Sequence, residues 1–467
     1  MRLRLIPPLE RQARLVAFGQ TLAGKLALIA ALAALLWPLR RLSPLAPGWF
    51  VVAAVAVTTA LPRHRRVVVA VVGALLLSLR VPHSWRAIGV MSGILGIQLP
   101  GSFRLISLVE AIVACGLYAL VATRFADTRL LRRPLALFLA LFVGAACVAA
   151  YAPIDPALAL WTWGFLFALA PLIWFLAYTL HDRRNQARAP LLVQLGTYTP
   201  FWGSTHTPFP KSGAYLSKIE VRSAEELAVW QLKGLKLLAW ALLLALARLG
   251  FQRVVYESLG VPTVHEAMSS ALPIARHRRW ASLFANLFDE TFNIAVMGHM
   301  YIGICRMSGW KALRNTWRPL EALTIAEFFN RFFFYFKELL VDFFFYPTYL
   351  RHFKRHPRLR TFAATFAAAA VGNILFHYLR DMEYVALYGP YKAMVTFQTY
   401  VLYSVVLGVG VGVSQLRGRR RARSWWRARL ANLFVLGFFA VLLVFNDPKR
   451  TIGADVYVRW VLGLFGA

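Results

Sequence analysis

Acidic residues and cysteines are scarce in this chain of 467 residues. It has 20 Asp and Glu residues against 53 Lys and Arg residues, and charged residues make up only 16% of it. About a quarter of an ordinary soluble domain is charged, so this composition argues against a soluble protein. Cys115, Cys147 and Cys305 each lie alone within an apolar run. We therefore expect small buried thiols, with no disulfide framework and no bound metal.

Alternating polar and apolar residues are also absent, so we expect no membrane β-barrel. Long apolar runs are present instead, and 59% of the residues are hydrophobic. A membrane-spanning helix needs roughly 20 apolar residues. The runs near that length are 22–39, 46–62, 66–79, 104–122, 134–151, 157–181, 226–249, 281–305, 359–380, 393–416 and 430–446. They predict an all-α, polytopic integral membrane protein with about ten to eleven transmembrane helices, together with re-entrant and interfacial helices.

The formal net charge of +33 comes from Lys and Arg residues that lie between the apolar runs. This is the distribution that the positive-inside rule gives to cytoplasmic loops. We therefore expect the lipid bilayer as a partner and no nucleic acid. We also expect a multi-pass protein of the cell (inner) membrane. Three parts are predicted: N-terminal transmembrane helices over 1–190, a core over 191–392 and C-terminal transmembrane helices over 393–467.

Two segments interrupt the apolar pattern. Residues 195–215 contain three Gly and three Pro residues, which argue against a regular helix. Such a segment is either a re-entrant loop that lines a cavity or an ordinary surface loop. The run 281–305 contains Asp289, Glu290, Asn293 and His299, which predict a helix face turned to a cavity or to partner helices.

Residues 321–381 are the stretch around which we expect the chemistry. Its first part, 326–350, is crowded with Phe and Tyr, as in a helix that lies partly in the headgroup layer. Burying polar residues there costs free energy unless they are paired or take part in function. Asn330, Phe334, Glu338 and Asp342 are spaced by four, which predicts one helical face ending before Pro347.

The second part of this stretch is an apolar helix expected over 359–380. Asn373, His377 and Asp381 are spaced by four and share a face if the helix continues through Asp381. A carboxylate one turn from an imidazole fixes its tautomer and raises its basicity, as a general base requires. The alternative is a solvated histidine at a helix end with no chemical role.

Three segments together resemble the membrane-bound O-acyltransferases. They are GHMYIGICRMSGW (298–310), TIAEFFNRFFFYFKELLVDFFFYP (324–347) and FAAAAVGNILFHYLRD (366–381). The nearest branch is the one of bacterial alginate acetylation and teichoic-acid D-alanylation, from which this chain is divergent. The resemblance implies that His377 is the catalytic histidine, that Asn330 and Arg331 hold polar positions and that Asp342 holds the aspartate. His299 stands where the first segment of the family has an aspartate, and we assign it with Arg331 to binding of the acyl donor.

The resemblance implies transfer of an acyl group from a thioester to a hydroxyl of a glycan, lipid or small molecule. The donor is expected to be acyl-CoA or an acyl group on a carrier protein, with no bound cofactor. His377 would take the proton of the acceptor hydroxyl, while Asp381 or Asn373 orients the ring. The Arg-rich loops 351–360 and 417–429 either attract an acidic carrier or serve topology and solvation alone.

One departure from the family pattern supports a second hypothesis. Phe333 stands where the family has its first histidine, in the segment 324–347. A non-catalytic relative that scaffolds or passes a lipid or polymer would need no polar group at that position. A continuous cavity that reaches His377 is what the catalytic hypothesis predicts.

Overall fold

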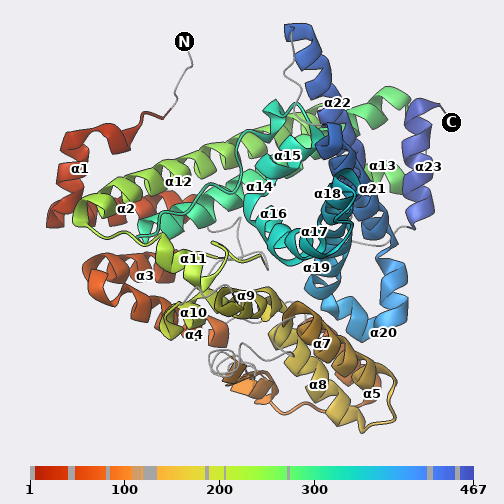
Figure 1. Ribbon diagram of the computed structural model, residues 1–467, viewed down its shortest axis with the longest axis horizontal. Coiled ribbons are helices and arrows are strands. Elements are labelled where there is room, and N and C mark those ends of the chain that lie inside the picture. Colours follow the sequence, from red (N-terminus) through yellow and green to blue (C-terminus); the bar gives the residue numbers. More distant parts are fainter. Residues whose placement is uncertain are drawn as a thin grey trace. The chain divides into compact units, whose positions relative to one another are not determined.

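The computed structural model describes residues 6–39, 48–79, 85–107, 109–110, 113–114, 117–118, 134–184, 189–203, 207–270, 274–417, 424–446 and 453–466. These residues form helices joined by short connections (Figure 1). No β-strand occurs among them, and the one β-bridge joins Glu220 to Trp310. The prediction of an all-α fold is therefore confirmed for the described residues.

Five of the described helices are long and apolar enough to cross a bilayer. They are Leu22–Leu39, Ala224–Ser258, Pro357–Arg380, Gln398–Arg417 and Trp425–Val444. The bent pair Pro156–Leu169 and Ile173–Asp182, which meets at 59°, raises the number to six if it forms one span. This is fewer than the ten to eleven spans expected from hydropathy. Gly48–Ala60 forms a helix too short to cross alone, and the expected run 104–122 lies mostly outside the described residues.

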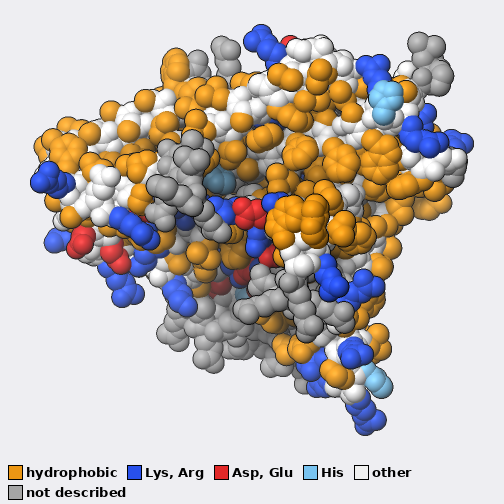
Figure 2. Space-filling view, turned by 90° about the horizontal axis from the view of Figure 1, so that it is seen from above, with side chains coloured by type: hydrophobic (Ala, Val, Ile, Leu, Met, Phe, Trp, Pro, Cys, Tyr) orange, Lys and Arg blue, Asp and Glu red, His pale blue; other side chains and the backbone are white. Residues whose placement is uncertain are grey.

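Hydrophobic side chains also cover much of the surface that Figure 2 shows. Soluble proteins rarely expose apolar patches larger than a few hundred Å². Large apolar side chains on the membrane-length helices are exposed, including Leu26 and Trp37 on α2 (Leu22–Leu39) and Leu433 and Phe434 on α22 (Trp425–Val444). The helix lengths and this surface together indicate a helical membrane protein.

The chain folds as two compact units, neither of them continuous in sequence. The first unit comprises 1–242, 299–313 and 379–391, and the second comprises 243–298, 314–378 and 392–467. The boundaries expected near 190 and 392 stay predictions.

The first unit holds the N-terminal helices. Its elements are α1 (Ala13–Gln20), α2 (Leu22–Leu39), α3 (Gly48–Ala60), α4 (Arg65–Leu79), α5 (Trp85–Leu95), α7 (Pro134–Tyr151), α8 (Pro156–Leu169), α9 (Ile173–Arg184), α10 (Leu191–Tyr198) and α11 (Gly213–Lys218). It also takes in most of α12 (Ala224–Gln252), the last turns of α14 (Arg276–Met307) and the first part of α20 (Met382–Thr396).

The segment 195–215 is partly helical and is covered by protein. Helix α10 runs through Gly196, where a Cβ would lie 2.4 Å from Val69 on α4, so only glycine permits this packing. The chain then becomes irregular, yet Phe201, Trp202 and Phe209 are buried. Thr199 Oγ1 donates a hydrogen bond to the carbonyl of Gly73. The described part of this segment is therefore not an ordinary surface loop.

Polar side chains on α12 are paired within the first unit. Gln231 Nε2 donates to Thr59 Oγ1 at 2.9 Å and to the carbonyl of Met307 at 3.0 Å. Lys236 Nζ binds both carboxylate oxygens of Glu10, at 2.6 and 2.8 Å. These bonds let an otherwise apolar helix carry an amide and an ammonium group.

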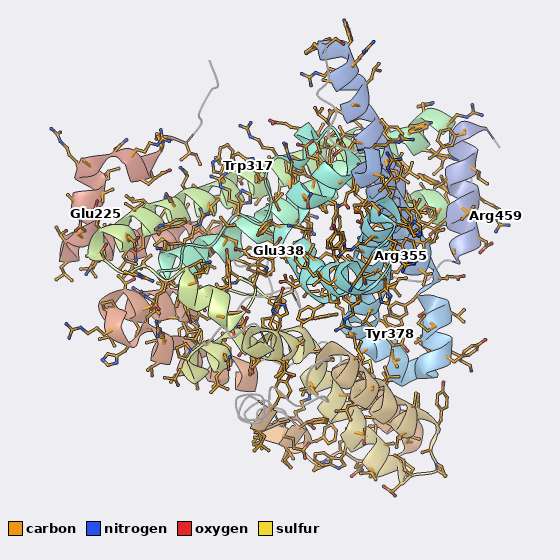
Figure 3. The ribbon with its side chains drawn as sticks, in the orientation of Figure 1. Glu225, Trp317, Glu338, Arg355, Tyr378 and Arg459 are labelled. Atoms are coloured by element: carbon orange, nitrogen blue, oxygen red, sulfur yellow. The ribbon has the colours of Figure 1, made fainter. Side chains whose placement is uncertain are left out.

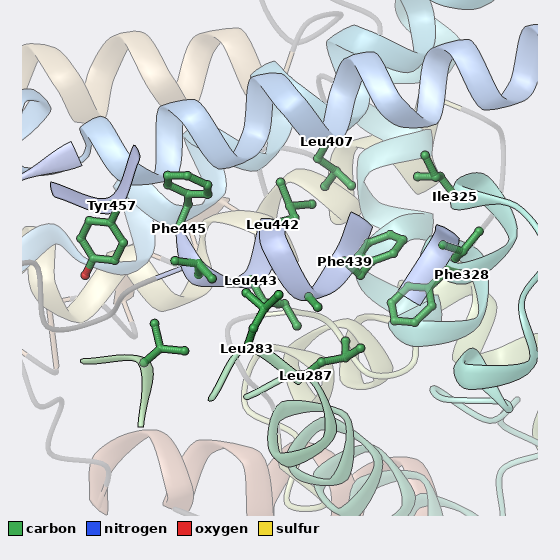
Figure 4. Packing of buried hydrophobic residues seen from close by; sticks show 14 of the residues in the cluster. Leu283, Leu287, Ile325, Phe328, Leu407, Phe439, Leu442, Leu443, Phe445 and Tyr457 are labelled. Atoms are coloured by element: carbon green, nitrogen blue, oxygen red, sulfur yellow. The ribbon is translucent and has the colours of Figure 1, made fainter. Parts of the chain in front are cut away.

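The second unit holds the aromatic stretch and the C-terminal helices. Its elements are the end of α12 with the π-helical segment Arg253–Ser258, α13 (Val264–Ser269), most of α14, α15 (Ile325–Phe332), α16 (Phe334–Leu340), α17 (Tyr346–Arg351), α18 (Pro357–Phe366), α19 (Asn373–Arg380), α21 (Gln398–Arg417), α22 (Trp425–Val444) and α23 (Ala454–Phe465). The rings of Phe328 on α15 and Phe439 on α22 stack at 3.8 Å in its core (Figure 4).

Helix α21 packs closely against the helix that runs from α18 to α19 (Figure 1). A Cβ on Gly408 would lie 2.9 Å from Cβ of Ala370, and one on Gly412 would lie 2.8 Å from the ring of Phe362. Gly410, on the other side of α21, meets Phe438 of α22 in the same way, at 2.6 Å. Small residues spaced by four allow helices in a bilayer to approach closely enough for dense van der Waals packing.

We predict that Gly408→Val destabilises the protein, because its side chain would overlap Ala370. Overpacking of this kind costs about 1–3 kcal/mol. The matched control is Gly437→Val on α22, since a Cβ at Gly437 meets nothing within 4 Å. Thermal unfolding of purified protein in lipid nanodiscs measures both variants. Equal stability of the two variants would contradict the close helix contact.

We also predict a pH dependence that comes from Glu10. Burial alone would raise its pKa, but the hydrogen bonds and charges of Lys236, with the charge of Lys233, outweigh burial and lower the pKa below the ordinary 4.5. A lowered acid pKa gives stability that is present above pH 4.5 and is lost as the pH falls through the folded-state pKa.

Glu10→Gln should therefore be less stable than the parent near neutral pH, by about 1 kcal/mol or less. The difference should disappear as the pH is lowered below 4.5. Unfolding temperatures of both proteins across this pH range test the prediction, and a constant difference at all pH values would refute it.

Candidate functional site

His377 lies near the end of a membrane-length helix that starts at Pro357. This helix comprises α18, the π-helical segment η7 (Ala367–Gly372) and α19, and it ends at Arg380. Its bounds agree with the apolar helix expected over 359–380. The side chain of His377 is 8% exposed. The imidazole is therefore buried and not solvated as the alternative had it, and its chemical role stays a prediction.

Aromatic rings fix the orientation of His377. Its imidazole stacks on the ring of Tyr400 in α21, with centroids 4.2 Å apart and planes at 20°. Tyr400 is itself only 1% exposed. Tyr378, the next residue on α19 (Figure 3), packs against Phe397 at 5.2 Å. Stacking covers a face of the imidazole, whereas proton transfer uses the nitrogens on its edge.

Asn373 and His377 share one face of α19, as their spacing predicts. Asn373 is the first residue of α19, one turn before His377, and is 1% exposed. Asp381 does not continue this face, because α19 ends at Arg380 and Asp381 stands in a turn before α20. Arg380 binds both oxygens of its carboxylate, at 2.8 and 2.9 Å. The condition under which Asp381 would share this face, a helix that continues through it, is therefore not met.

The aromatic stretch is not one helix. Its helical path breaks at Phe333, whose φ of −142° and ψ of 81° separate α15 from α16. The segment η6 (Val341–Phe345) is π-helical. Spacing by four therefore does not place Asn330 and Asp342 on a common face, contrary to the expectation. Pro347 does not end the helix either, because it occupies the first turn of α17.

Asn315 accounts for the break at Phe333, and its place in the sequence gives no sign of this role. Its backbone carbonyl accepts a hydrogen bond from Phe334 N at 2.9 Å, and its Oδ1 accepts one from Tyr335 N at 3.2 Å. The first backbone N–H groups of a helix lack partners within the helix. Asn315 supplies those partners to α16 from a buried position in the connection before α15.

The remaining predicted residues have different surroundings. Asn330 is exposed on α15. Arg331 donates to Glu327 at 2.7 Å and to the carbonyl of Arg318 at 3.2 Å, so its guanidinium is held by neighbouring chain. His299 is buried in the part of α14 that belongs to the first unit.

The segment that carries Asp342 packs on the helix that carries His377. A Cβ on Gly372 would lie 2.7 Å from Phe344 and 2.8 Å from Leu340. The rings of Phe336 and Phe376 lie 4.6 Å apart. Two π-helical segments, η6 and η7, thus meet immediately before Asn373. π-helical segments are frequent at functional sites.

A second polar cluster joins α12 to α14 within the second unit. Arg248 forms two bonds of 2.9 Å to the carboxylate of Asp289, and a third of 2.9 Å to Asn293 Oδ1. Gln252 donates to Asp289 at 2.8 Å. Asp289 and Asn293 therefore face a partner helix, which is one of the two alternatives that the sequence left open.

The rings of Phe376 and Tyr400 contact the imidazole of His377. A buried imidazole held by stacking can accept a proton from a hydroxyl and return it to a leaving group. No group of three or more His, Cys, Asp or Glu residues suited to a metal ion occurs in the described part of the chain.

No protein-family model matches the chain, and no curated protein sequence matches it. The resemblance to the membrane-bound O-acyltransferases therefore stays a prediction that stands on three sequence segments alone.

We predict that Asp289→Asn lowers stability, because it leaves the Arg248 guanidinium without its charged partner. Hydrogen bonds to charged groups contribute about 1.5–3 kcal/mol. Glu257→Gln is the control, because its pair with Arg253 is exposed and 3.8 Å long, and such pairs contribute about 0–1 kcal/mol. Chemical denaturation in detergent compares the two, and an equal effect would exclude a clamp at Asp289.

Proposed function

We propose that this protein is a membrane-bound O-acyltransferase in which His377 is the general base. The main support is the buried imidazole near the end of a membrane-length helix, stacked on Tyr400 and one turn from Asn373. Intramembrane ionisable residues are costly, so a buried one is a functional candidate by default. The order of the three family-like segments supplies the reaction type.

In the proposed reaction the imidazole of His377 acts first as a general base and then as a general acid. His377 takes the proton of the acceptor hydroxyl as its oxygen attacks the thioester carbonyl carbon. A carbon–oxygen bond forms, the carbon–sulfur bond breaks, and the imidazolium returns the proton to the thiolate. Arg380 already holds the Asp381 carboxylate, so stacking on Tyr400, and not Asp381, is proposed to orient the ring.

The donor is proposed to approach from the cytoplasmic side. Phe362 near the start of α18 packs at Gly412 near the end of α21, so the two helices are antiparallel and Pro357 and Arg417 lie at one end. Exposed Arg351, Lys354, Arg355 and Arg358 precede or begin α18 there. Basic ends face the cytoplasm, where they would attract acyl-CoA or an acidic acyl carrier.

A further part of this proposal concerns the membrane itself. We place the protein in the cell (inner) membrane, with the acceptor, a glycan, lipid or small molecule, entering from the opposite side. The shorter apolar helices, such as α3 and α7, would also lie in the bilayer and bring the number of membrane segments towards ten or eleven.

The second candidate is a non-catalytic protein that scaffolds or passes a lipid or polymer. Phe333 supports it, because this residue replaces the histidine of the family and its ring packs on Phe336 at 5.5 Å. An apolar contact at that position offers no group for proton transfer.

We predict that His377→Ala abolishes thioester-dependent acyl transfer. General acid–base groups contribute about 10²–10⁴-fold to rate. The measurement is release of free CoA from acetyl-CoA, and of holo carrier from acyl carrier protein, by protein in nanodiscs.

His352→Ala is the control, because His352 is exposed in the connection before α18. Full activity of His377→Ala would eliminate the base mechanism. Absence of thioester cleavage by the parent protein with both donors would favour the non-catalytic candidate.

A further inference from the structure

Two buried polar atoms, one on α19 and one on α21, lack a hydrogen-bond partner among the described residues. They are Asn373 Oδ1 and Ser404 Oγ. Asn373 is 1% exposed and Ser404 is 0% exposed. Buried polar groups in proteins nearly always have a partner, and leaving one without any is costly. This pair of atoms therefore calls for a specific explanation.

The register of the two helices places Asn373 opposite Ser404. Close contacts join Phe362 to Gly412 and Ala370 to Gly408, and the rings of His377 and Tyr400 stack. The two helices are therefore antiparallel, so residue numbers increase along one helix as they decrease along the other. Asn373 is three residues after Ala370, and Ser404 is four residues before Gly408. Both positions fall between the glycine contact and the stacked rings.

Thr365, another hydroxyl residue on this helix pair, behaves differently, whereas Thr399 Oγ1 at the start of α21 also has no partner among the described residues. Thr365 Oγ1 donates to the carbonyl of Thr361 at 2.8 Å and also contacts Gln415. A serine or threonine within a helix commonly bonds the carbonyl one turn before it. Ser404 makes no such bond in the described structure. Its hydroxyl is thus available to a group that is not part of its own helix.

We propose that Asn373 and Ser404 form a subsite for one neutral hydroxyl of a polyhydroxy acceptor. A single ligand hydroxyl satisfies both atoms, because it donates to Asn373 Oδ1 and accepts from the Ser404 hydroxyl. The subsite lies one helical turn from the His377–Tyr400 pair, about 5.4 Å along the axis. A hydroxyl held there leaves a neighbouring hydroxyl of the same molecule beside the imidazole.

This subsite specifies the acceptor class, and it rests on the proposed acyl transfer only for the role of His377. The groups that form it are an amide oxygen and a hydroxyl, which suit a sugar or polyol. A monohydroxy alcohol would fill only the position beside His377. The acceptor is therefore a glycan or polyol, and Ser404 and Asn373 are positioning residues for it.

The test is binding by two ring-shaped probes, methyl α-glucopyranoside with several hydroxyls and cyclohexanol with one. Saturation-transfer NMR on the full-length protein in nanodiscs gives their affinities. The sugar should bind more tightly than cyclohexanol, and Ser404→Ala should weaken sugar binding about 5–10-fold without changing cyclohexanol binding. Ser404→Ala only removes an atom, so it should fold normally.

Thr365→Val is the matched control, since it removes a buried hydroxyl that is already bonded on the same helix pair. It should leave both affinities unchanged. Equal binding of the two probes, or an unchanged sugar affinity in Ser404→Ala, overturns the subsite. Equal loss in Thr365→Val also overturns it, because the effect would then come from helix packing.

Steady-state kinetic measurements test the subsite separately from the proposed acyl transfer. With acetyl-CoA as donor, Ser404→Ala should raise KM for the sugar about 5–10-fold and leave the KM for acetyl-CoA unchanged. Ser404-dependent sugar binding without any acyl transfer would keep the subsite and remove the transferase. Acyl transfer to the sugar that is indifferent to Ser404→Ala would keep the transferase and remove the subsite.

Discussion

The close approach of α21 to the helix Pro357–Arg380 is the contact on which the candidate site depends. It exists because Gly408 and Gly412 present no side chain to Ala370 and Phe362. In a bilayer the hydrophobic effect does not drive helices together, so dense contact between small residues must do so. This contact sets the register in which Tyr400 meets His377. The position of the imidazole is thus a consequence of glycines several turns away.

Three acidic groups of the described residues pair with cations beside or within apolar helices. Asp289 binds Arg248, Glu10 binds Lys236 and Asp381 binds Arg380. A paired carboxylate in an apolar setting compensates a cation that would otherwise be costly to bury. The face shared by Asn373 and His377 carries an amide and an imidazole instead. Such a face suits proton transfer from a neutral hydroxyl better than binding of a cation.

Departures from regular α-helix gather beside this face. The segment with Asp342 and the one before Asn373 are both π-helical, and they pack on each other through Gly372. A π-helical turn shifts the direction of every side chain that follows it. The π-helical segment η7 therefore sets the directions of the Asn373 and His377 side chains that follow it. Asn315 caps the start of α16 at Phe334. Helix α16 leads directly into the π-helical segment that carries Asp342, which is the other side of this contact.

Hydropathy and spacing determined the all-α class, the helix that ends near His377 and the common face of Asn373 and His377, because helical periodicity is local. They also predicted ten to eleven spans, of which five or six occur as membrane-length helices among the described residues. The break at Phe333, where Asn315 caps the next helix, and the stacking of His377 on Tyr400 came only from the tertiary structure. Those features depend on contacts between residues distant along the chain, which no local pattern encodes.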